Sequence, residues 1–514
     1  MDNLYGLFKK QFSIHADRSC ILSPEGEKLF SFCDIDEQSA LLSGLLKSLD
    51  IELGDRVIVQ VEKSVQMMIL YLACLRQGII FIPLNTAYTA NEVDYFIANA
   101  QPKLIVCQGD NAPNLQPLAN KHGVKHLLTL DGMGPGSVPH YLQTACPEHT
   151  IAKVAPDTVA AVLYTSGTTG LSKGAMLTHK NLSSNAQALQ QIWGWRDDDI
   201  LLHALPIFHA HGLFVGIHLA LLNASPMIFL PTFEAISVIN NLPKATVFMG
   251  VPTHYSRLLA NPQFDLEACR NIRLFISGSA PLSEETFGLF AERSGQNILE
   301  RYGMTEAVMI TSNPLAGHRV PGTVGYSLPD VQVRVVDKSG QEITNGGIGE
   351  LEITGPNVFP GYWQMPEKTQ QEFTEDGFFR TGDLATITVD GRVSIVGRSK
   401  DMIISGGYNV YPKEIEGHID RIDGVSESAV VGLPHSDFGE AVTAIVILDG
   451  TATVSKKCIT EALRPLLAGF KIPKNIYFAD ELPRNAMGKV QKKTLRQQYM
   501  VVNNDEPSSL HEKT

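Results

Sequence analysis

The sequence is poor in cysteine, and the cysteines that it has form no recognisable pattern. There are seven, an odd number scattered along the chain without a CxxC pair, which indicates neither a disulfide framework nor a cysteine-bound zinc ion. Long uninterrupted apolar runs are also lacking, because residues 65–84 include Arg76 and residues 213–230 include His218 and Pro226. Both stretches fit a buried helix followed by a strand better than a membrane span.

The N-terminal stretch "MDNLYGLFKKQF" lacks the apolar core of a signal peptide and the arginine bias of a transit peptide. Together with the scattered thiols, this predicts a cytoplasmic protein with no membrane span.

Positive charge is in short supply. The 42 lysine and arginine residues face 54 acidic ones, for a net charge of −12, which argues against a protein that binds nucleic acid through bulk electrostatics. An anionic substrate would need positive charge gathered locally. Residues 471–496, with seven basic residues against two acidic ones, are one such region.

The chain does have length and regular alternation. Its 514 residues exceed what one hydrophobic core usually supports. Strand-like runs such as 103–108 alternate with helical ones and predict βαβ units, whereas short alternating strands begin near residue 331. We therefore expect an α/β protein with these parts: a large N-terminal domain of βαβ-type sheets with a small β-rich subdomain (1–397), a hinge (398–402), a small mobile α+β C-terminal domain (403–500) and a polar tail (501–514).

The strongest local signal is "VAAVLYTSGTTGLSKG" at residues 159–174. An apolar strand ends in serine, threonine and glycine with one lysine, Lys173, so backbone N–H groups, hydroxyls and a charge can surround phosphate groups. The loop is not a Walker A motif, because Ser172 precedes Lys173 and Gly174 follows it. A second strand, "GAMLTH", follows instead of a helix.

The run "YTSGTTGLSKG" resembles the signature loop of the adenylate-forming superfamily, which comprises acyl-CoA synthetases, adenylation domains of peptide synthetases and luciferases. Further motifs that resemble the landmarks of this superfamily follow in its order over nearly the whole chain: "PIFH" (206–209), "ISGSAPL" (276–282), "YGMTE" (302–306), "TGD" (381–383), "GRSKDMIISGGYNVYPKEIE" (397–416) and "PRNAMGK" (483–489). The resemblance implies that a carboxylic acid first attacks the α-phosphate of ATP and releases pyrophosphate. A thiol, expected to be that of coenzyme A, then displaces AMP, and Mg²⁺ assists.

The resemblance also implies the residues that contact ATP: Thr165, Ser166, Gly167, Thr168, Thr169, Gly170, Lys173, Ser279, Glu300, Tyr302, Gly303, Met304, Thr305, Asp383, Arg398 and Lys489. The loop would hold the β- and γ-phosphates, Tyr302 would lie against the adenine, and backbone groups around Ser279 and Glu300 would read its edge. Asp383 would accept hydrogen bonds from the ribose hydroxyls, a role suited to an ionised carboxylate.

Three residues are expected to act in catalysis. Lys489 would bridge the attacking carboxylate and the α-phosphate, Lys173 would bind the phosphates, and Glu306, with Thr165 nearby, would hold Mg²⁺. One carboxylate suffices, because Mg²⁺ takes its other ligands from phosphates and water.

Two half-reactions need different surroundings, and in this superfamily the small domain rotates between them. Lys400 matches the hinge position of the superfamily. Gly406, Gly407 and Tyr408 would border the pantetheine arm of coenzyme A.

Arg301, in "ERYGMTE", places a permanent charge where many superfamily members hold the tail of the acid. An unpaired buried charge is strongly disfavoured, so Arg301 needs a carboxylate. Its chain neighbour Glu300 is one candidate, although adjacent side chains point apart, and a second carboxylate of the substrate is the other. A bidentate contact of about 2–3 kcal/mol would favour malonate over propionate roughly a hundredfold.

The segments "LLHALPIFHAHGLFVG" and "ATVFMGVPTHYSRLL" closely resemble malonyl-CoA synthetases. On that analogy the acyl pocket is lined by Arg301, His209, His211 and Ser277, and the protein is a malonate–CoA ligase. Three alternatives stay open: a synthetase for short or medium monocarboxylic acids, an adenylation protein that loads a carrier thiol, and a silent nucleotide-binding regulator.

Overall fold

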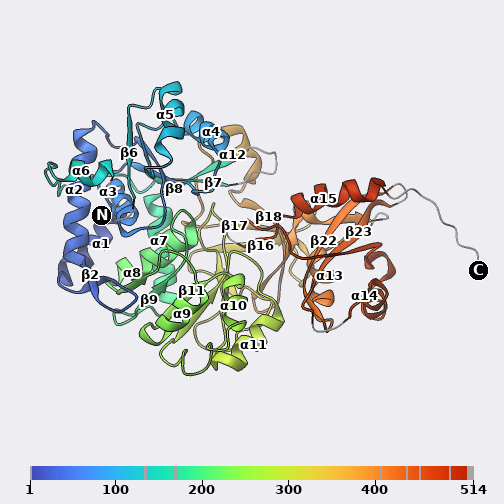
Figure 1. Ribbon diagram of the computed structural model, residues 1–514. Coiled ribbons are helices and arrows are strands. Elements are labelled where there is room, and N and C mark those ends of the chain that lie inside the picture. Colours follow the sequence, from blue (N-terminus) through green and yellow to red (C-terminus); the bar gives the residue numbers. More distant parts are fainter. Residues whose placement is uncertain are drawn as a thin grey trace, which may run out of the picture.

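The computed structural model describes residues 3–131, 136–165, 172–405, 408–435, 438–450, 453–485 and 488–505. They form a large part, which ends with β19 (Val393–Arg398), and a smaller part that follows it (Figure 1).

One six-stranded sheet carries the phosphate-loop motif at its edge. Its order is β6 (His126–Thr129), β5 (Leu104–Cys107), β3 (Arg56–Gln60), β4 (Ile80–Pro83), β7 (Val159–Thr165) and β8 (Lys173–Thr178). All pairs are parallel except β7 with β8, where Thr165 faces Lys173. The ends of the phosphate-loop motif are thereby held next to each other.

A nine-stranded sheet carries the other motifs. Its order is β15 (Tyr326–Ser327), β14 (Thr311–Ser312), β13 (Leu299–Tyr302), β12 (Leu274–Ser277), β11 (Val247–Gly250), β9 (Leu201–His203), β10 (Met227–Phe229), β1 (Ser19–Leu22) and β2 (Lys28–Ser31). The pairs between β13 and β1 are parallel, and the two ends are antiparallel. The central strands are buried apolar runs, as parallel sheets require.

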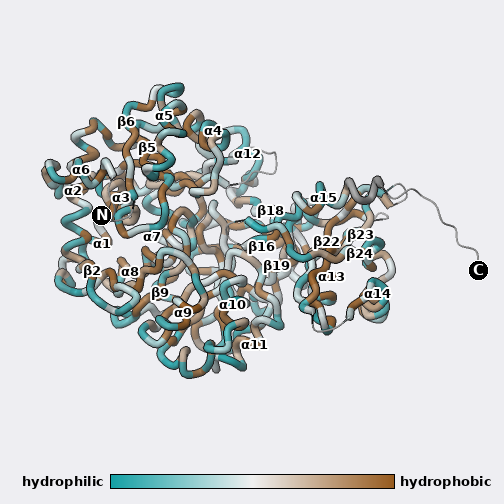
Figure 2. Tube along the Cα trace, viewed as in Figure 1, coloured by the Kyte–Doolittle hydropathy of each residue, from teal (hydrophilic) through white to brown (hydrophobic). Residues whose placement is uncertain are grey.

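Helices surround these sheets: α1 (Leu4–Ile14), α2 (Phe32–Ser48), α3 (Val65–Gln77), α4 (Ala90–Ala100), α5 (Ala112–Lys121), α6 (Ser137–Leu142), α7 (His179–Ile192), a π-helix η1 (His211–Ile217), α8 (His218–Leu222), α9 (Ala235–Asn241), α10 (Pro252–Leu259) and α11 (Glu284–Ser294). Capping boxes at Ser31, Thr89 and Thr178 fix where three of them begin. Apolar residues gather in the interior of both parts (Figure 2).

A four-stranded antiparallel sheet follows: β16 (Gln332–Val336), β17 (Gly349–Thr354), β18 (Phe379–Ile387) and β19, with α12 (Pro366–Glu372) between β17 and β18. The small part contains a five-stranded sheet and α-helices: β20 (Ile403–Ser405), β21 (Tyr408–Val410), β22 (Val425–His435), β23 (Gly439–Leu448), β24 (Asn475–Ala479), α13 (Pro412–Ile419), α14 (Lys456–Leu463) and α15 (Lys492–Asp505). It has its own apolar core around Ile415, Val442 and Leu463.

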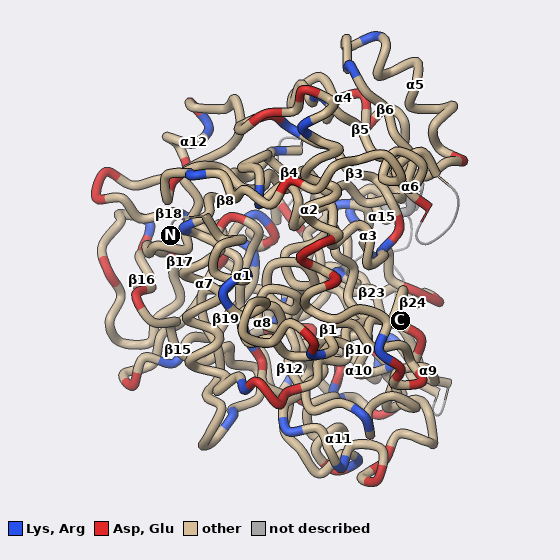
Figure 3. Tube along the Cα trace, turned by 90° about the vertical axis from the view of Figure 1, so that its left-hand side faces the viewer, with Lys and Arg blue, Asp and Glu red and all other residues tan. Residues whose placement is uncertain are grey.

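The α/β fold expected from the sequence is confirmed: a large N-terminal domain built on largely parallel sheets precedes a small C-terminal one. Over the described ranges, every helix is too short or too polar to cross a bilayer. Basic and acidic residues are interspersed along the described chain (Figure 3).

Candidate active site

The motifs meet at the carboxyl ends of the parallel strands in the nine-stranded sheet. Strands β9, β11, β12 and β13 end at His203, Gly250, Ser277 and Tyr302. Because parallel strands end at the same edge of a sheet, the loops that follow these four residues lie together. This edge is the usual place for a ligand in open α/β sheets.

Arg301 is buried here, with only 3% of its surface exposed. Its Nε and Nη2 atoms have no hydrogen-bond partner, and no carboxylate of the described residues forms an ion pair with it. Burial lowers the pKa of Arg301 to about 9, opposed only by the nearby Tyr255. The expectation that Glu300 would be a poor partner for Arg301 agrees with these contacts.

Two histidines lie near this charge, and Ser277 lies on the neighbouring strand β12, opposite Glu300. His211 is fully buried, and its Nδ1 is 3.4 Å from Ser279 Oγ. Over the part of the chain that the structure describes, His211 Nε2 and the buried Ser277 Oγ have no hydrogen-bond partner. Burial, reinforced by Arg301, lowers the pKa of His209 to about 4 and that of His211 well below its usual value. Both imidazoles are therefore neutral at neutral pH and add no positive charge beside Arg301.

A second cluster lies at the same carboxyl end of β13, around Tyr302, which follows Arg301 directly. Tyr302 donates its hydroxyl hydrogen to Asp383 Oδ2, and Arg398 Nε lies 2.7 Å from Asp383 Oδ1. Asp383 on β18 faces Arg398 on β19 in the sheet register. Three residues predicted for the nucleotide are thus in direct contact, although 96 positions separate Tyr302 from Arg398.

The turn after β13 holds the remaining residues of its motif. A side chain at Gly303 would overlap the carbonyl oxygen of Val308, so the turn closes tightly there, and Met304 and Thr305 lie within it. Glu306 is buried at its end and accepts a hydrogen bond of 3.0 Å from Tyr362. Burial raises the pKa of Glu306, because it removes the water that stabilises the charged carboxylate. A bound cation would restore that stabilisation.

Lys173 Nζ contacts the Tyr362 hydroxyl at 3.2 Å, and Thr165 Oγ1 bonds the Lys173 carbonyl oxygen at 3.4 Å. The residues predicted for the middle of the phosphate loop, Ser166, Gly167, Thr168, Thr169 and Gly170, lie outside the described residues. So do Gly406 and Gly407.

Lys489 reaches this site from the small part of the chain. Burial lowers the pKa of Lys489 to about 8, with smaller effects of Arg398, which lowers it, and Asp383, which raises it. Gly488 (φ +73°) approaches α10 so closely that an added methyl group would lie 2.8 Å from Thr253 Oγ1. The structure therefore brings Lys489 near Asp383 and Arg398, whose charges act on it.

Models of two protein families match the chain. The AMP-binding enzyme model covers residues 8–363, and the model of its C-terminal domain covers residues 414–489. The chain belongs to the AMP-binding enzyme family.

Relatives of this AMP-binding enzyme include a mitochondrial protein of Mus musculus, named malonate–CoA ligase ACSF3. It is 36% identical over 82% of this chain and 78% of its own length. Among solved structures, ATP-bound MatB from Rhodopseudomonas palustris is 47% identical over 98% of this chain and 99% of its own, with a TM-score of 0.95. The apo structure of the same MatB, with the same identity and coverage, gives a TM-score of 0.84.

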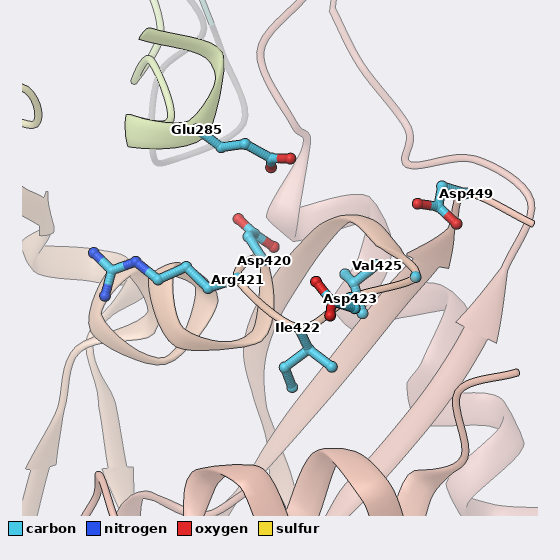
Figure 4. A pocket seen from close by; sticks show the side chains of 8 residues that line it. Glu285, Asp420, Arg421, Ile422, Asp423, Val425 and Asp449 are labelled. Carbon is cyan, nitrogen blue, oxygen red and sulfur yellow. The ribbon is translucent and has the colours of Figure 1, made fainter. Parts of the chain in front are cut away.

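The AMP-binding enzyme has a further hollow of about 420 Å³ between α11 and the small part, lined by Glu285, Asp420, Asp423 and Asp449 among others (Figure 4). Burial raises the pKa of Asp420 to about 7. An acidic lining repels phosphates and carboxylates, so this hollow does not suit an anionic substrate.

Sequence reasoning missed four residues of the site in this AMP-binding enzyme: Gly278, Thr253, Tyr362 and Glu372. Gly278 lies inside the motif "ISGSAPL", so its position was visible although its role was not. The others carry no local signal, because their contacts with Gly488 and Lys173 form only in the folded chain.

Proposed function

We propose that this enzyme joins malonate to coenzyme A, with conversion of ATP to AMP and pyrophosphate through a malonyl-adenylate. The observation that carries the proposal is the buried guanidinium of Arg301, whose Nε and Nη2 donors have no partner among the described residues. A cation in this state needs an anion, and the second carboxylate of a short dicarboxylic acid supplies one in the bidentate geometry that arginine prefers. The names of the similar ligase and the likeness to MatB support the same substrate class.

In the first half-reaction, one carboxylate of malonate attacks the α-phosphate and pyrophosphate leaves. Arg301 would hold the other carboxylate, and His211 and Ser277, each with an unpartnered polar atom, would complete its shell. Because the imidazoles are neutral, the pocket binds one negative charge with one positive charge. The distal carboxylate then stays fixed while its partner reacts.

The nucleotide would lie along Tyr302, Asp383 and Arg398. Asp383 would exchange its bonds to Tyr302 and Arg398 for ribose hydroxyls, and Ser279 and Glu300 would border the adenine. The loop from Thr165 to Lys173 would hold the β- and γ-phosphates. Glu306, a buried acid that forms no ion pair within the described residues, fits Mg²⁺, which would neutralise phosphate charge when bound.

Lys489 would bridge the attacking carboxylate and the α-phosphate. Its place beside Asp383 and Arg398 supports this role, and so does the better superposition on the ATP-bound MatB structure than on the apo form. Two anions meet in this step, and a cation that contacts both lowers the barrier.

In the second half-reaction, the thiol of coenzyme A attacks the acyl carbon and AMP leaves. We propose that residues 403–500 form a domain that rotates about residues 398–402, with Lys400 at the hinge. This rotation would carry Lys489 away from the site of adenylation. A short 3₁₀ helix at Ser399–Asp401 between two sheets supports this boundary. Tyr408, half exposed and stacked on Phe470 at 4.5 Å, would border the pantetheine arm with Gly406 and Gly407.

The test is AMP formation with Mg²⁺ATP and coenzyme A, with malonate, methylmalonate, propionate, acetate and octanoate compared. A strong lead of malonate is expected. A lead of octanoate or acetate would identify a monocarboxylic acyl-CoA synthetase, and adenylation without transfer to coenzyme A would favour loading of a carrier thiol. A cytoplasmic location also stays a prediction, since the mouse relative is named as mitochondrial.

A further inference from the structure

Lys173, the cation of the phosphate-loop motif, has an acidic partner far away in the sequence. Its Nζ lies 3.3 Å from Glu372 Oε1 at the end of α12. The same Nζ contacts the Tyr362 hydroxyl at 3.2 Å and lies 4.3 Å from the centre of that ring. Both side chains of the ion pair are largely buried, with exposures of 12% and 23%, so water screens their attraction only in part.

The backbone holds these groups in place. Tyr362 bridges to Ala175 on β8, and Trp363 donates its N–H to the Gly174 carbonyl oxygen at 2.7 Å. The hydroxyl of Tyr362 in turn donates to Glu306 Oε1 at 3.0 Å. A continuous chain of contacts therefore runs from Glu372 through Lys173 and Tyr362 to the carboxylate proposed for Mg²⁺.

Glu372 is ionised in this setting. Burial raises its pKa, but hydrogen bonds and charges of Lys368 and Lys173 outweigh burial and leave the pKa below its usual value. Lys368, one helical turn earlier, lies 2.9 Å from the same oxygen, Oε1. Glu372 thus forms ion pairs with two cations, Lys368 on α12 and Lys173 of the phosphate-loop motif.

We propose that Glu372 is an internal competitor of the ATP polyphosphate for Lys173, displaced when ATP binds and paired again when pyrophosphate leaves. The inference rests on the proposed function, in which Lys173 binds the β- and γ-phosphates. A phosphate oxygen at ion-pair distance from Lys173 would stand close to the Glu372 carboxylate, and like charges at this distance repel. Glu372 therefore weakens the binding of both ATP and pyrophosphate and speeds the departure of the product.

Lys368 makes the competition adjustable. Lys368 keeps the Glu372 carboxylate on α12 while Lys173 binds the phosphates. Without Lys368, Glu372 would have Lys173 as its only cationic partner among the described residues. Removal of Glu372 and removal of Lys368 are expected to change the affinity for phosphates in opposite directions. A uniform effect of charge near the phosphates would give the same opposition, so a matched charge change elsewhere on α12 is needed as a control.

The test measures binding of Mg²⁺ATP and of Mg²⁺ pyrophosphate by calorimetry, without any acid substrate. Glu372→Gln should tighten both by about tenfold, the effect of one charge-assisted contact, whereas Lys368→Met should weaken both. Glu367→Gln, on the first turn of α12, makes the same change in net charge and should bind like the wild type. In turnover, Glu372→Gln should lower the KM for ATP and increase inhibition by pyrophosphate.

Unchanged or weaker binding by Glu372→Gln, or a shift of both variants in the same direction, would overturn the proposal. These outcomes are separate from failure of the proposed function. An enzyme that binds ATP with the expected opposition but converts no malonate would refute the malonate assignment alone, and a wild type that binds neither ATP nor pyrophosphate would refute both.

Discussion

The guanidinium of Arg301 lies against the α-carbon of Gly278. A methyl group built on that carbon would stand 2.5 Å from Nε and from Nη1 and closer still to Cζ. Position 278 therefore accepts no side chain while Arg301 keeps its place. A glycine in "ISGSAPL" and an arginine 23 positions later together set where the positive charge of the proposed acyl pocket lies.

Gly278→Ala should displace the guanidinium and reduce the preference for malonate over propionate by about tenfold or more, because a misplaced charge loses its bidentate contact. ATP affinity should stay near the wild-type value, since the hydrogen bond between Tyr302 and Asp383 does not involve Arg301, whose Nε and Nη2 have no partner among the described residues. Steady-state kinetics with both acids, together with ATP binding, provide the measurement.

The matched control is Gly288→Ala, in the middle of α11 with open space around its α-carbon. It should keep the malonate preference and raise stability slightly, because alanine favours the helix by about 1 kcal/mol. A Gly278→Ala enzyme with an unchanged malonate-to-propionate ratio would show that the guanidinium does not depend on this glycine.

Gly488→Ala should slow adenylation. Its φ of +73° disfavours a side chain by about 1 kcal/mol, and the added methyl group would meet Thr253. The loop that carries Lys489 then no longer seats on α10, so ATP–pyrophosphate exchange in the presence of malonate should fall by roughly 10- to 100-fold. Affinity for ATP should change little.

Gly469→Ala, also in the small part but in open space and without a positive φ, controls for general destabilisation. The double variant Gly488→Ala, Thr253→Ala should recover part of the lost exchange, since it removes the closest atom. An exchange rate in Gly488→Ala equal to that of the wild type would mean that Lys489 does not need this close approach.

The raised pKa of Glu300 predicts that the free energy of unfolding depends on pH. Burial raises its pKa from 4.5 to about 7, against smaller lowering effects of Lys413 and two backbone N–H groups. The folded state therefore holds this proton more tightly than the unfolded state, and stability falls as pH rises from about 4.5 to about 7. Glu300→Gln should remove up to about 3 kcal/mol of that fall.

Urea unfolding of wild type and Glu300→Gln at pH 5 and pH 8 measures the difference directly. Glu285→Gln, an exposed neighbour of the same region, should behave like the wild type. Equal losses of stability between the two pH values in wild type and Glu300→Gln would contradict the raised pKa.

Much of the fold could be predicted from the sequence, because its signals are local. The apolar run 65–77 followed by Ile80–Pro83 formed the expected helix and strand, and the strand after the phosphate loop formed as β8. The grouping of Tyr302, Asp383 and Arg398 was implied by the superfamily's motifs rather than by spacing. The structure adds that the three are in direct contact.

The contacts of Gly278, Glu372 and Thr253 could not be predicted. Each depends on which surfaces meet after folding: Arg301 on Gly278, Lys173 on Glu372, and Gly488 on Thr253. A sequence gives the chemistry of such residues but not their neighbours. The π-helix at His211–Ile217 could not be predicted either, because the apolar run in the sequence indicated only a buried helix.

The most direct test of the account compares malonate with propionate in wild type and Arg301→Met. Propionate is malonate with a methyl group in place of the second carboxylate, and methionine fills the space of arginine without its charge. We predict that wild type prefers malonate by about a hundredfold and that Arg301→Met loses this preference while it still binds ATP and activates propionate weakly. An Arg301→Met enzyme that is folded, binds ATP and prefers malonate as strongly as wild type would contradict the role of Arg301 as the reader of the second carboxylate.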